Sequence, residues 1–191
     1  MLRSADEVLA ISAKLAFWLG TGPIMRGWCL GAVGRAAEGT PLLVGGLSVR
    51  RSTGAKLVVP FYLTTFAEIC GMAAQPQQGL DRLAEAAELV EITQERWAEA
   101  EIHRVRGTLL LSLRDSIAAE DSYRRALAVA QQQSAKFWEL RAAVDLARLW
   151  LNQGKRTEAR DLLPPIYEWF TEGFDTPVLK EAKALLEQLG A

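Results

Sequence analysis

The residues that could carry chemistry are few and scattered along the sequence. His103 is the only histidine, so a multi-histidine zinc site cannot be assembled, and the serines lack the nucleophile elbow that a histidine-based catalytic relay would need. General acid–base catalysis needs two carboxylates in different environments of one cleft. The acidic clusters have instead the spacing of solvated faces on amphipathic helices, at Asp6-Glu7, at Glu85, Glu88 and Glu91, and at Glu120-Asp121. We therefore expect a protein that is not an enzyme.

Cofactor, metal, nucleic-acid and membrane binding find no support in the sequence either. The glycine pairs lack the Gly-Lys-Ser/Thr context of a phosphate loop, and Cys29 and Cys70 fit no metal or redox motif. A formal net charge of −1 lacks the basic excess of a nucleic-acid binder. Asp6, Glu7 and Lys14 interrupt the apolar start, which is unlike a signal peptide. We expect no cofactor, no nucleic acid and no membrane partner, and a cytoplasmic protein.

An internal repeat of 40 residues organises the chain. Segments starting at 27, 67, 107 and 147 carry a small residue first, a second small residue twelve positions later and a large residue four positions after that. Gly and Ala let two helices approach closely, and a large side chain fills the adjoining space. The expected repeat core is Gly27, Ala67, Gly107 and Ala147, then Gly39, Gly79, Ala119 and Ala159, then Leu43, Leu83, Tyr123 and Leu163.

Each copy predicts two antiparallel helices joined by a short turn. Stretches with helical apolar spacing are separated by turn residues at Gly34-Arg35, Gln75-Pro76, Arg114-Asp115-Ser116 and Gly154-Lys155. A column of large apolar residues keeps the same spacing just before the first helix of each copy, at Phe17, Leu57, Trp97 and Phe137. The predicted fold is all-α, a right-handed superhelical stack of antiparallel helix hairpins.

The whole chain, 1–191, is expected to form one repeat domain. Its predicted parts are a helix over 5–19 without its hairpin partner, repeats over 20–56, 57–96, 97–136 and 137–174, and a capping helix over 175–191 that starts after Asp175-Thr176-Pro177. One face of the unpartnered first helix carries Val8, Ile11, Leu15 and Leu19. We expect this apolar edge to form a homodimer.

The copy with Gly107, Ala119, Tyr123 and Ala126 resembles the tetratricopeptide repeat (TPR), although the usual period of that family is about 34 residues. The segments AEIHRVRGTLLL and FWELRAAVDLARLW also resemble the carboxy-terminal repeats of bacterial regulators that join a nucleotide-cyclase-like or winged-helix domain to a STAND-type ATPase domain. This resemblance implies a non-catalytic protein-interaction or regulatory module. It also implies that the chain is either a fragment of such a regulator or a short relative that kept only the repeats.

In such a stack, the first helices of the hairpins line an inner face that meets the partner. The polar or exposed positions expected there are Trp28, Thr64, Glu68, Glu101, Arg104, Thr108, Arg141 and Arg148. Asp145 is spaced to pair with Arg141 and Arg148, whereas Arg104 is expected to lack a partner, which makes this face mildly positive and suited to an acidic protein or peptide. The alternatives are a small effector bound in the groove and, more remotely, an enzyme.

Overall fold

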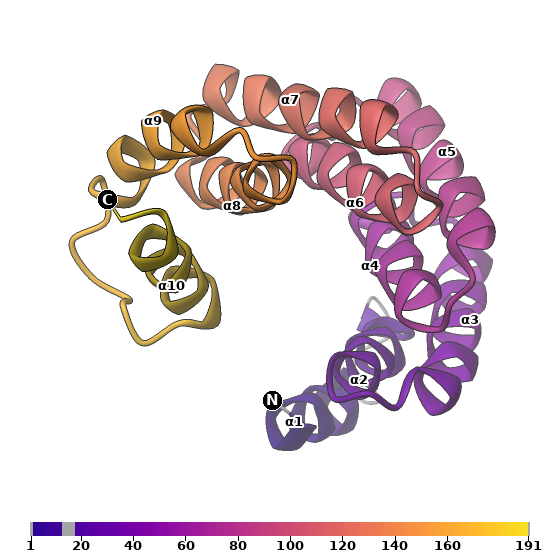
Figure 1. The fold of residues 1–191 in the computed structure, drawn as a ribbon. Helices are drawn as coiled ribbons and strands as arrows, with labels where there is room; N and C mark the ends of the chain where they lie inside the picture. Colours follow the sequence, from indigo (N-terminus) through magenta and orange to yellow (C-terminus); the bar gives the residue numbers. More distant parts are fainter. Residues whose placement is uncertain (1, 13–17, 191) are drawn as a thin grey trace. The chain divides into compact units, whose positions relative to one another are not determined.

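The computed structural model describes residues 2–12 and 18–190. These residues form ten α-helices and no β-strand (Figure 1). The helices are α1 (Leu2–Ser12), α2 (Thr21–Ala32), α3 (Ala36–Ser52), α4 (Val59–Met72), α5 (Pro76–Thr93), α6 (Glu99–Ser112), α7 (Ser116–Gln132), α8 (Lys136–Asn152), α9 (Arg156–Tyr167) and α10 (Pro177–Leu189). Contacts group them into two compact units, unit 1 (Met1–Ala98) and unit 2 (Glu99–Ala191), each a stack of antiparallel hairpins.

A residue in the left-handed conformation ends the first helix of every hairpin. These residues are 40 positions apart, at Gly34, Ala74, Arg114 and Gly154, with φ of 83°, 57°, 64° and 80°. The next amide donates a hydrogen bond to the carbonyl five residues earlier, as in Arg35 N to Leu30 O at 2.8 Å. This is the Schellman arrangement, which satisfies carbonyls at the end of a helix.

A second left-handed series separates one hairpin from the next. It consists of Gly54, Gln94 and Ser134, with φ of 72°, 58° and 53°. The two series alternate every 20 residues, so the chain reverses at the same position in every copy. The period of 40 is therefore a property of the backbone as well as of the sequence, and the prediction of an all-α hairpin repeat is confirmed.

Helices α2 and α3 of unit 1 cross with their backbones in contact. A Cβ atom on Gly27 would lie 2.6 Å from the carbonyl oxygen of Gly39, and a Cβ atom on Gly39 would collide with the carbonyl of Gly27. Gly20 and Gly46 meet in the same way, since a Cβ atom on Gly46 would lie 2.5 Å from the carbonyl oxygen of Gly20. Both of these close contacts require glycine because the obstacle is backbone, which has little room to shift.

Two adjacent glycines of α3 are expected to respond oppositely to alanine. Gly46→Ala forces a methyl group against the Gly20 carbonyl and is expected to lower the free energy of unfolding by about 2–3 kcal/mol. A Cβ atom on Gly45 meets nothing within 4 Å. Gly45→Ala should therefore raise the free energy of unfolding by about 0.5–1 kcal/mol, because alanine loses less backbone freedom on folding. Urea denaturation measures the free energy of unfolding of both variants. Changes of the same sign in the two variants would contradict the close crossing of α2 and α3.

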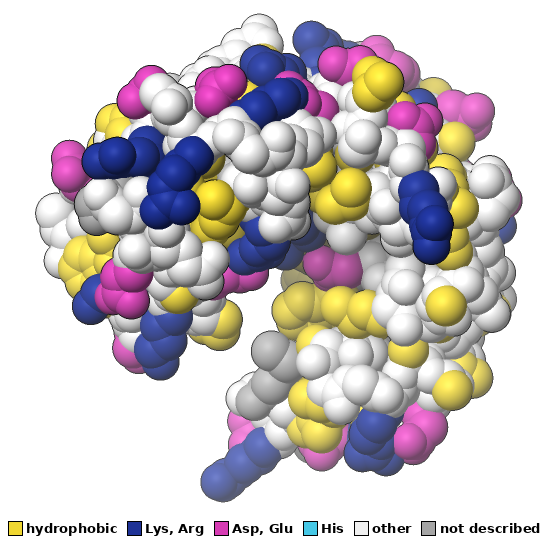
Figure 2. Space-filling model, in the orientation of Figure 1, with side chains coloured by type: hydrophobic (Ala, Val, Ile, Leu, Met, Phe, Trp, Pro, Cys, Tyr) yellow, Lys and Arg dark blue, Asp and Glu magenta, His cyan; other side chains and the backbone are white. Residues whose placement is uncertain are grey.

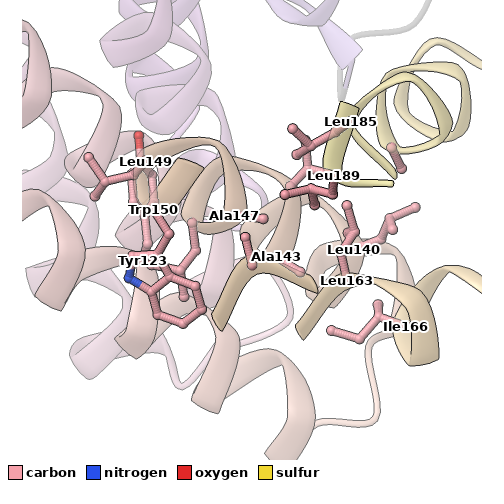
Figure 3. Close-up of a cluster of buried hydrophobic side chains, with 14 of the residues drawn as sticks. Tyr123, Leu140, Ala143, Ala147, Leu149, Trp150, Leu163, Ile166, Leu185 and Leu189 are labelled. Atoms are coloured by element: carbon pink, nitrogen blue, oxygen red, sulfur yellow. The ribbon is translucent and has the colours of Figure 1, made fainter. Parts of the chain in front are cut away.

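The hydrophobic core of unit 2 is continuous from α7 to α10 (Figure 3). Leu140, Ala143 and Ala147 of α8 belong to one buried cluster with Leu163 of α9 and Leu185 of α10. Tyr123 of α7 and Trp150 of α8 belong to the same cluster. The last helix is therefore held by the same core as the hairpins, and Gly190 ends it in the left-handed conformation.

Tyr123 fills the space beside the smallest residue of α6. A Cβ atom on Gly107 would lie 2.6 Å from the tyrosine ring, and the phenol oxygen lies 3.2 Å from Thr108 Oγ1. Burial, followed by the charge of Asp145, raises the pKa of Tyr123 to about 12. The other members of the small and large columns are buried as well, at Gly27, Gly39, Leu43, Ala67, Gly79, Leu83, Gly107, Ala119, Ala147, Ala159 and Leu163.

The amino-terminal helix differs from the prediction over 5–19. Helix α1 is Leu2–Ser12, and Leu19 lies in the turn before α2. Ala5 is buried, and α1 packs against α2. The helix therefore begins three residues before the predicted start, and residues 13–17 of the predicted range lie outside the described residues.

Candidate protein-interaction surface

The surface expected to meet a partner is a network of ion pairs in unit 2. Its inner members are Glu101 and Arg104 of α6, which are only 3% and 7% exposed. Arg104 Nη2 and Nε donate to the two carboxylate oxygens of Glu101 at 2.8 and 2.9 Å. Arg104 Nη1 donates to Asp145 Oδ2 at 2.7 Å, and Arg141 Nη1 lies 2.8 Å from Glu101 Oε1. The network therefore joins α6 to α8 through buried charges.

The outer members of the network join α8 to α10. Arg148 Nη2 donates to Glu181 Oε1 at 2.6 Å, and Arg148 Nη1 lies 3.6 Å from Asp145 Oδ1. The side chain of Arg148 is 42% exposed. We use the name charged strip for the six residues Glu101, Arg104, Arg141, Asp145, Arg148 and Glu181. Thr108 lies on the same helix as Glu101 and is exposed.

The expectation that Arg104 has no partner is wrong. Glu101, three residues earlier on the same helix, and Asp145, on the next hairpin, both accept hydrogen bonds from it. Three arginines face three carboxylates in the charged strip, so the strip is balanced and not mildly positive. The reason for expecting an acidic partner in the middle of the strip is thereby removed, because Arg104 is buried and engaged.

In unit 1, the corresponding residues are linked to each other. Trp28 Nε1 of α2 donates to Glu68 Oε2 of α4 at 2.7 Å, and both side chains are half-buried. Thr64 differs from the prediction, since it is 1% exposed and its hydroxyl donates to Pro60 O at 2.9 Å. Thr64 does not reach the surface because α4 packs nearly all of its faces.

Glu181 belongs to the site although the sequence did not point to it. Glu181 is exposed on α10, and it accepts the hydrogen bond from Arg148. No helical spacing links the two residues because they lie on different helices. The repeat could have indicated this pair. Helix α10 follows α9 as the first helix of a further hairpin would, and it contacts α8.

The apolar edge predicted on the first helix is exposed where the structure describes it. Ile11 is 59% exposed, and Val8 and Leu19 are also exposed. Leu15 and Phe17 lie outside the described residues. Figure 2 shows hydrophobic side chains in yellow over the α1 and α2 part of unit 1, with basic and acidic side chains interspersed over the surface. Dimer formation through this edge stays a prediction.

Metal-binding clusters and membrane-spanning helices are both absent from the described residues. Within 2–12 and 18–190, no group of three or more His, Cys, Asp or Glu side chains is placed to hold a metal ion. None of the helices in this part of the chain is long and apolar enough to cross a membrane.

Comparison with known proteins identifies the fold. No protein-family model and no curated protein sequence matches the chain. Among solved structures, it is similar to a Rap protein complexed with competence and sporulation factor (TM-score 0.70, 16% identity), with 90% of this chain and 53% of that chain covered. The match thus spans about half of the Rap chain.

Two further structures are similar over most of both chains. BtubC from P. vanneervenii matches with a TM-score of 0.72 and 12% identity, covering 99% of this chain and 88% of that chain. A putative kinesin light chain from Podosopora anserina, with nearly identical TPR-like repeats, matches with a TM-score of 0.63 and 15% identity, covering 89% and 92%. The chain therefore has the fold of a TPR-like helical repeat protein.

Proposed function

We propose that the chain is a non-catalytic docking module that binds a protein or peptide on the charged strip of unit 2. The TPR-like fold supports the proposal, because stacked hairpins present side chains at fixed intervals to an extended partner. The similar Rap structure was solved with competence and sporulation factor bound. The context we propose, from the sequence resemblance, is a bacterial cytoplasmic regulator.

The observation that carries the proposal is the arrangement of the charged strip. Buried Glu101 and Arg104 fix the positions of Arg141 and Asp145, and Arg148 extends from them toward the solvent. Side chains held in this way lose little conformational freedom when a partner binds. A charged surface with both signs suits a segment that carries both signs, with a carboxylate of the partner placed on Arg148.

Arg148→Ala is expected to weaken binding of a partner captured from the source organism by about 1–2 kcal/mol, which is a factor of about 5 to 30 in Kd. The exposed position of Arg148 means that its ion pairs contribute little to stability, so the melting temperature should stay within a few degrees of wild type. Calorimetry with the purified partner measures the change in Kd.

Arg124→Ala is the matched control, because it removes the same charge from a residue that faces Glu120 and the ring of Trp150. This variant should bind the partner as the wild type does. Equal losses of affinity in the two variants would show a nonspecific effect of charge, and an unchanged Kd for Arg148→Ala would place recognition elsewhere.

A further inference from the structure

A second feature of unit 2 lies outside the charged strip. A cavity of about 490 Å³ opens between the two helices of the α6–α7 hairpin. Its volume falls in the range of about 300–1,000 Å³ that is usual for small-molecule sites. The polar residues that line it are His103 and Arg106 of α6, the cap residue Asp115, and Asp121, Ser122 and Arg125 of α7.

Two arginines and the histidine are among the residues that line the cavity. His103 and Arg106 are three residues apart on α6 and therefore share one side of the helix. Burial, above all, lowers the pKa of His103; Glu99 opposes this effect, and the charges of Arg125 and Arg106 add to it. The two guanidinium groups therefore act on the same imidazole from the two helices of the hairpin.

Within residues 2–12 and 18–190, neither guanidinium group has a hydrogen-bond or ion-pair partner. In the part of the chain that the structure describes, no carboxylate lies within ion-pair distance of Arg106 or Arg125. This distinguishes the pair from the arginines of the charged strip, each of which has a carboxylate partner. Two unengaged guanidinium groups beside a half-buried imidazole offer several hydrogen-bond donors to one anionic group.

The other polar groups of the cavity limit what can bind. Asp115 Oδ1 is occupied as the cap of α7, where it accepts the Ala118 amide at 3.0 Å. The Ser122 hydroxyl donates to Ala118 O at 2.8 Å, which leaves it an acceptor. Asp121 precedes Arg125 by one helical turn and repels a second negative charge. The site therefore suits one anionic group on a molecule that is otherwise neutral or cationic.

We propose that this cavity binds a small organic molecule through a single carboxylate or phosphate group held by Arg106 and Arg125. The proposal does not depend on the docking function, because none of the cavity residues belongs to the charged strip. It would give the chain a ligand-responsive site as well as a docking surface.

The single histidine makes the test direct, since the imidazole signals in a proton NMR spectrum of the full chain come from His103 alone. The probes are glycerol phosphate, N-acetylalanine and inorganic phosphate, which separate a phosphate ester, a carboxylate and a bare ion. An organic probe is expected to shift the His103 signal saturably and to raise the pKa of His103, because a nearby anion favours the imidazolium. Its Kd should be lower than that of inorganic phosphate by about tenfold or more.

The double variant Arg106→Gln/Arg125→Gln is expected to weaken this binding by about tenfold or more. Arg124→Gln removes the same charge from the neighbouring position, which faces Glu120, and should bind as the wild type does. Three results would overturn the proposal: no saturation by either organic probe at about 10 mM, inorganic phosphate bound as tightly as the organic probes, or equal binding by the double variant.

Discussion

Arg104→Ala is expected to destabilise unit 2 by about 3–5 kcal/mol, the cost of removing one partner from a buried ion pair. Glu101 is 3% exposed and accepts two hydrogen bonds from Arg104, so the substitution leaves a buried carboxylate with Arg141 as its remaining cation. Asp145 loses its shortest ion pair at the same time. An Arg104 without a partner, as expected from the sequence, would have contributed little to stability.

Urea denaturation measures the loss for Arg104→Ala, and Arg148→Ala is the control from the same network. Arg148 is half-exposed, so its substitution should cost less than about 1 kcal/mol. Arg104→Lys keeps the charge but cannot make the paired hydrogen bonds to Glu101, and it should fall between the two. A stability of Arg104→Ala equal to that of the wild type would mean that the network does not hold α6 against α8.

Tyr123→Ala is expected to lower the free energy of unfolding by about 3–5 kcal/mol, the usual cost of removing a buried aromatic ring. The ring occupies the space that Gly107 leaves open, and neither Gly107 nor Ala119 has a side chain large enough to fill the cavity. Tyr123→Phe removes the hydroxyl group that meets Thr108 and should cost about 1 kcal/mol.

Arg124→Ala separates the packing effect at Tyr123 from a general effect of substitutions in α7. Arg124 is exposed, although it pairs with Glu120 and lies over the ring of Trp150, and we expect its loss to cost about 1 kcal/mol. Hydrogen exchange should show the loss of protection for Tyr123→Ala in α6 to α10, the helices of unit 2. Equal destabilisation by Tyr123→Ala and Arg124→Ala would mean that the small and large columns have been assigned in the wrong register.

The hairpin repeat could be predicted from the sequence because the packing rule that produces it is local and recurs. A small residue such as Gly27, Ala67 or Gly107 is needed where the two helices of a hairpin cross, and the spacing of 40 residues repeats that need in each copy. The turns were predictable for the same reason at Gly34 and Gly154, where glycine adopts the left-handed conformation. At Ala74 and Arg114 the same conformation occurs without glycine, so only the period reveals it.

The partners of the charged residues could not be predicted because they depend on which helices become neighbours. Arg104 and Asp145 lie 41 residues apart, and one period of the repeat brings them together. The ion pair between Arg104 and Glu101 could be predicted from their helical spacing, but its burial depends on how the helices pack. The burial of Thr64 had a clearer signal, since α4 carries apolar residues on nearly every face and Glu68 as its only charge.

Site-specific photocrosslinking in cells of the source organism tests the proposed docking function most directly. Benzoylphenylalanine replaces Thr108 or Glu181, which are exposed at the proposed surface, or Ala128, which is exposed on α7. If a protein or peptide docks on the charged strip, the first two positions should give covalent adducts with the same partner, and the Ala128 position should not. Adducts from Ala128 alone, or none from Thr108 and Glu181, would contradict docking on the charged strip.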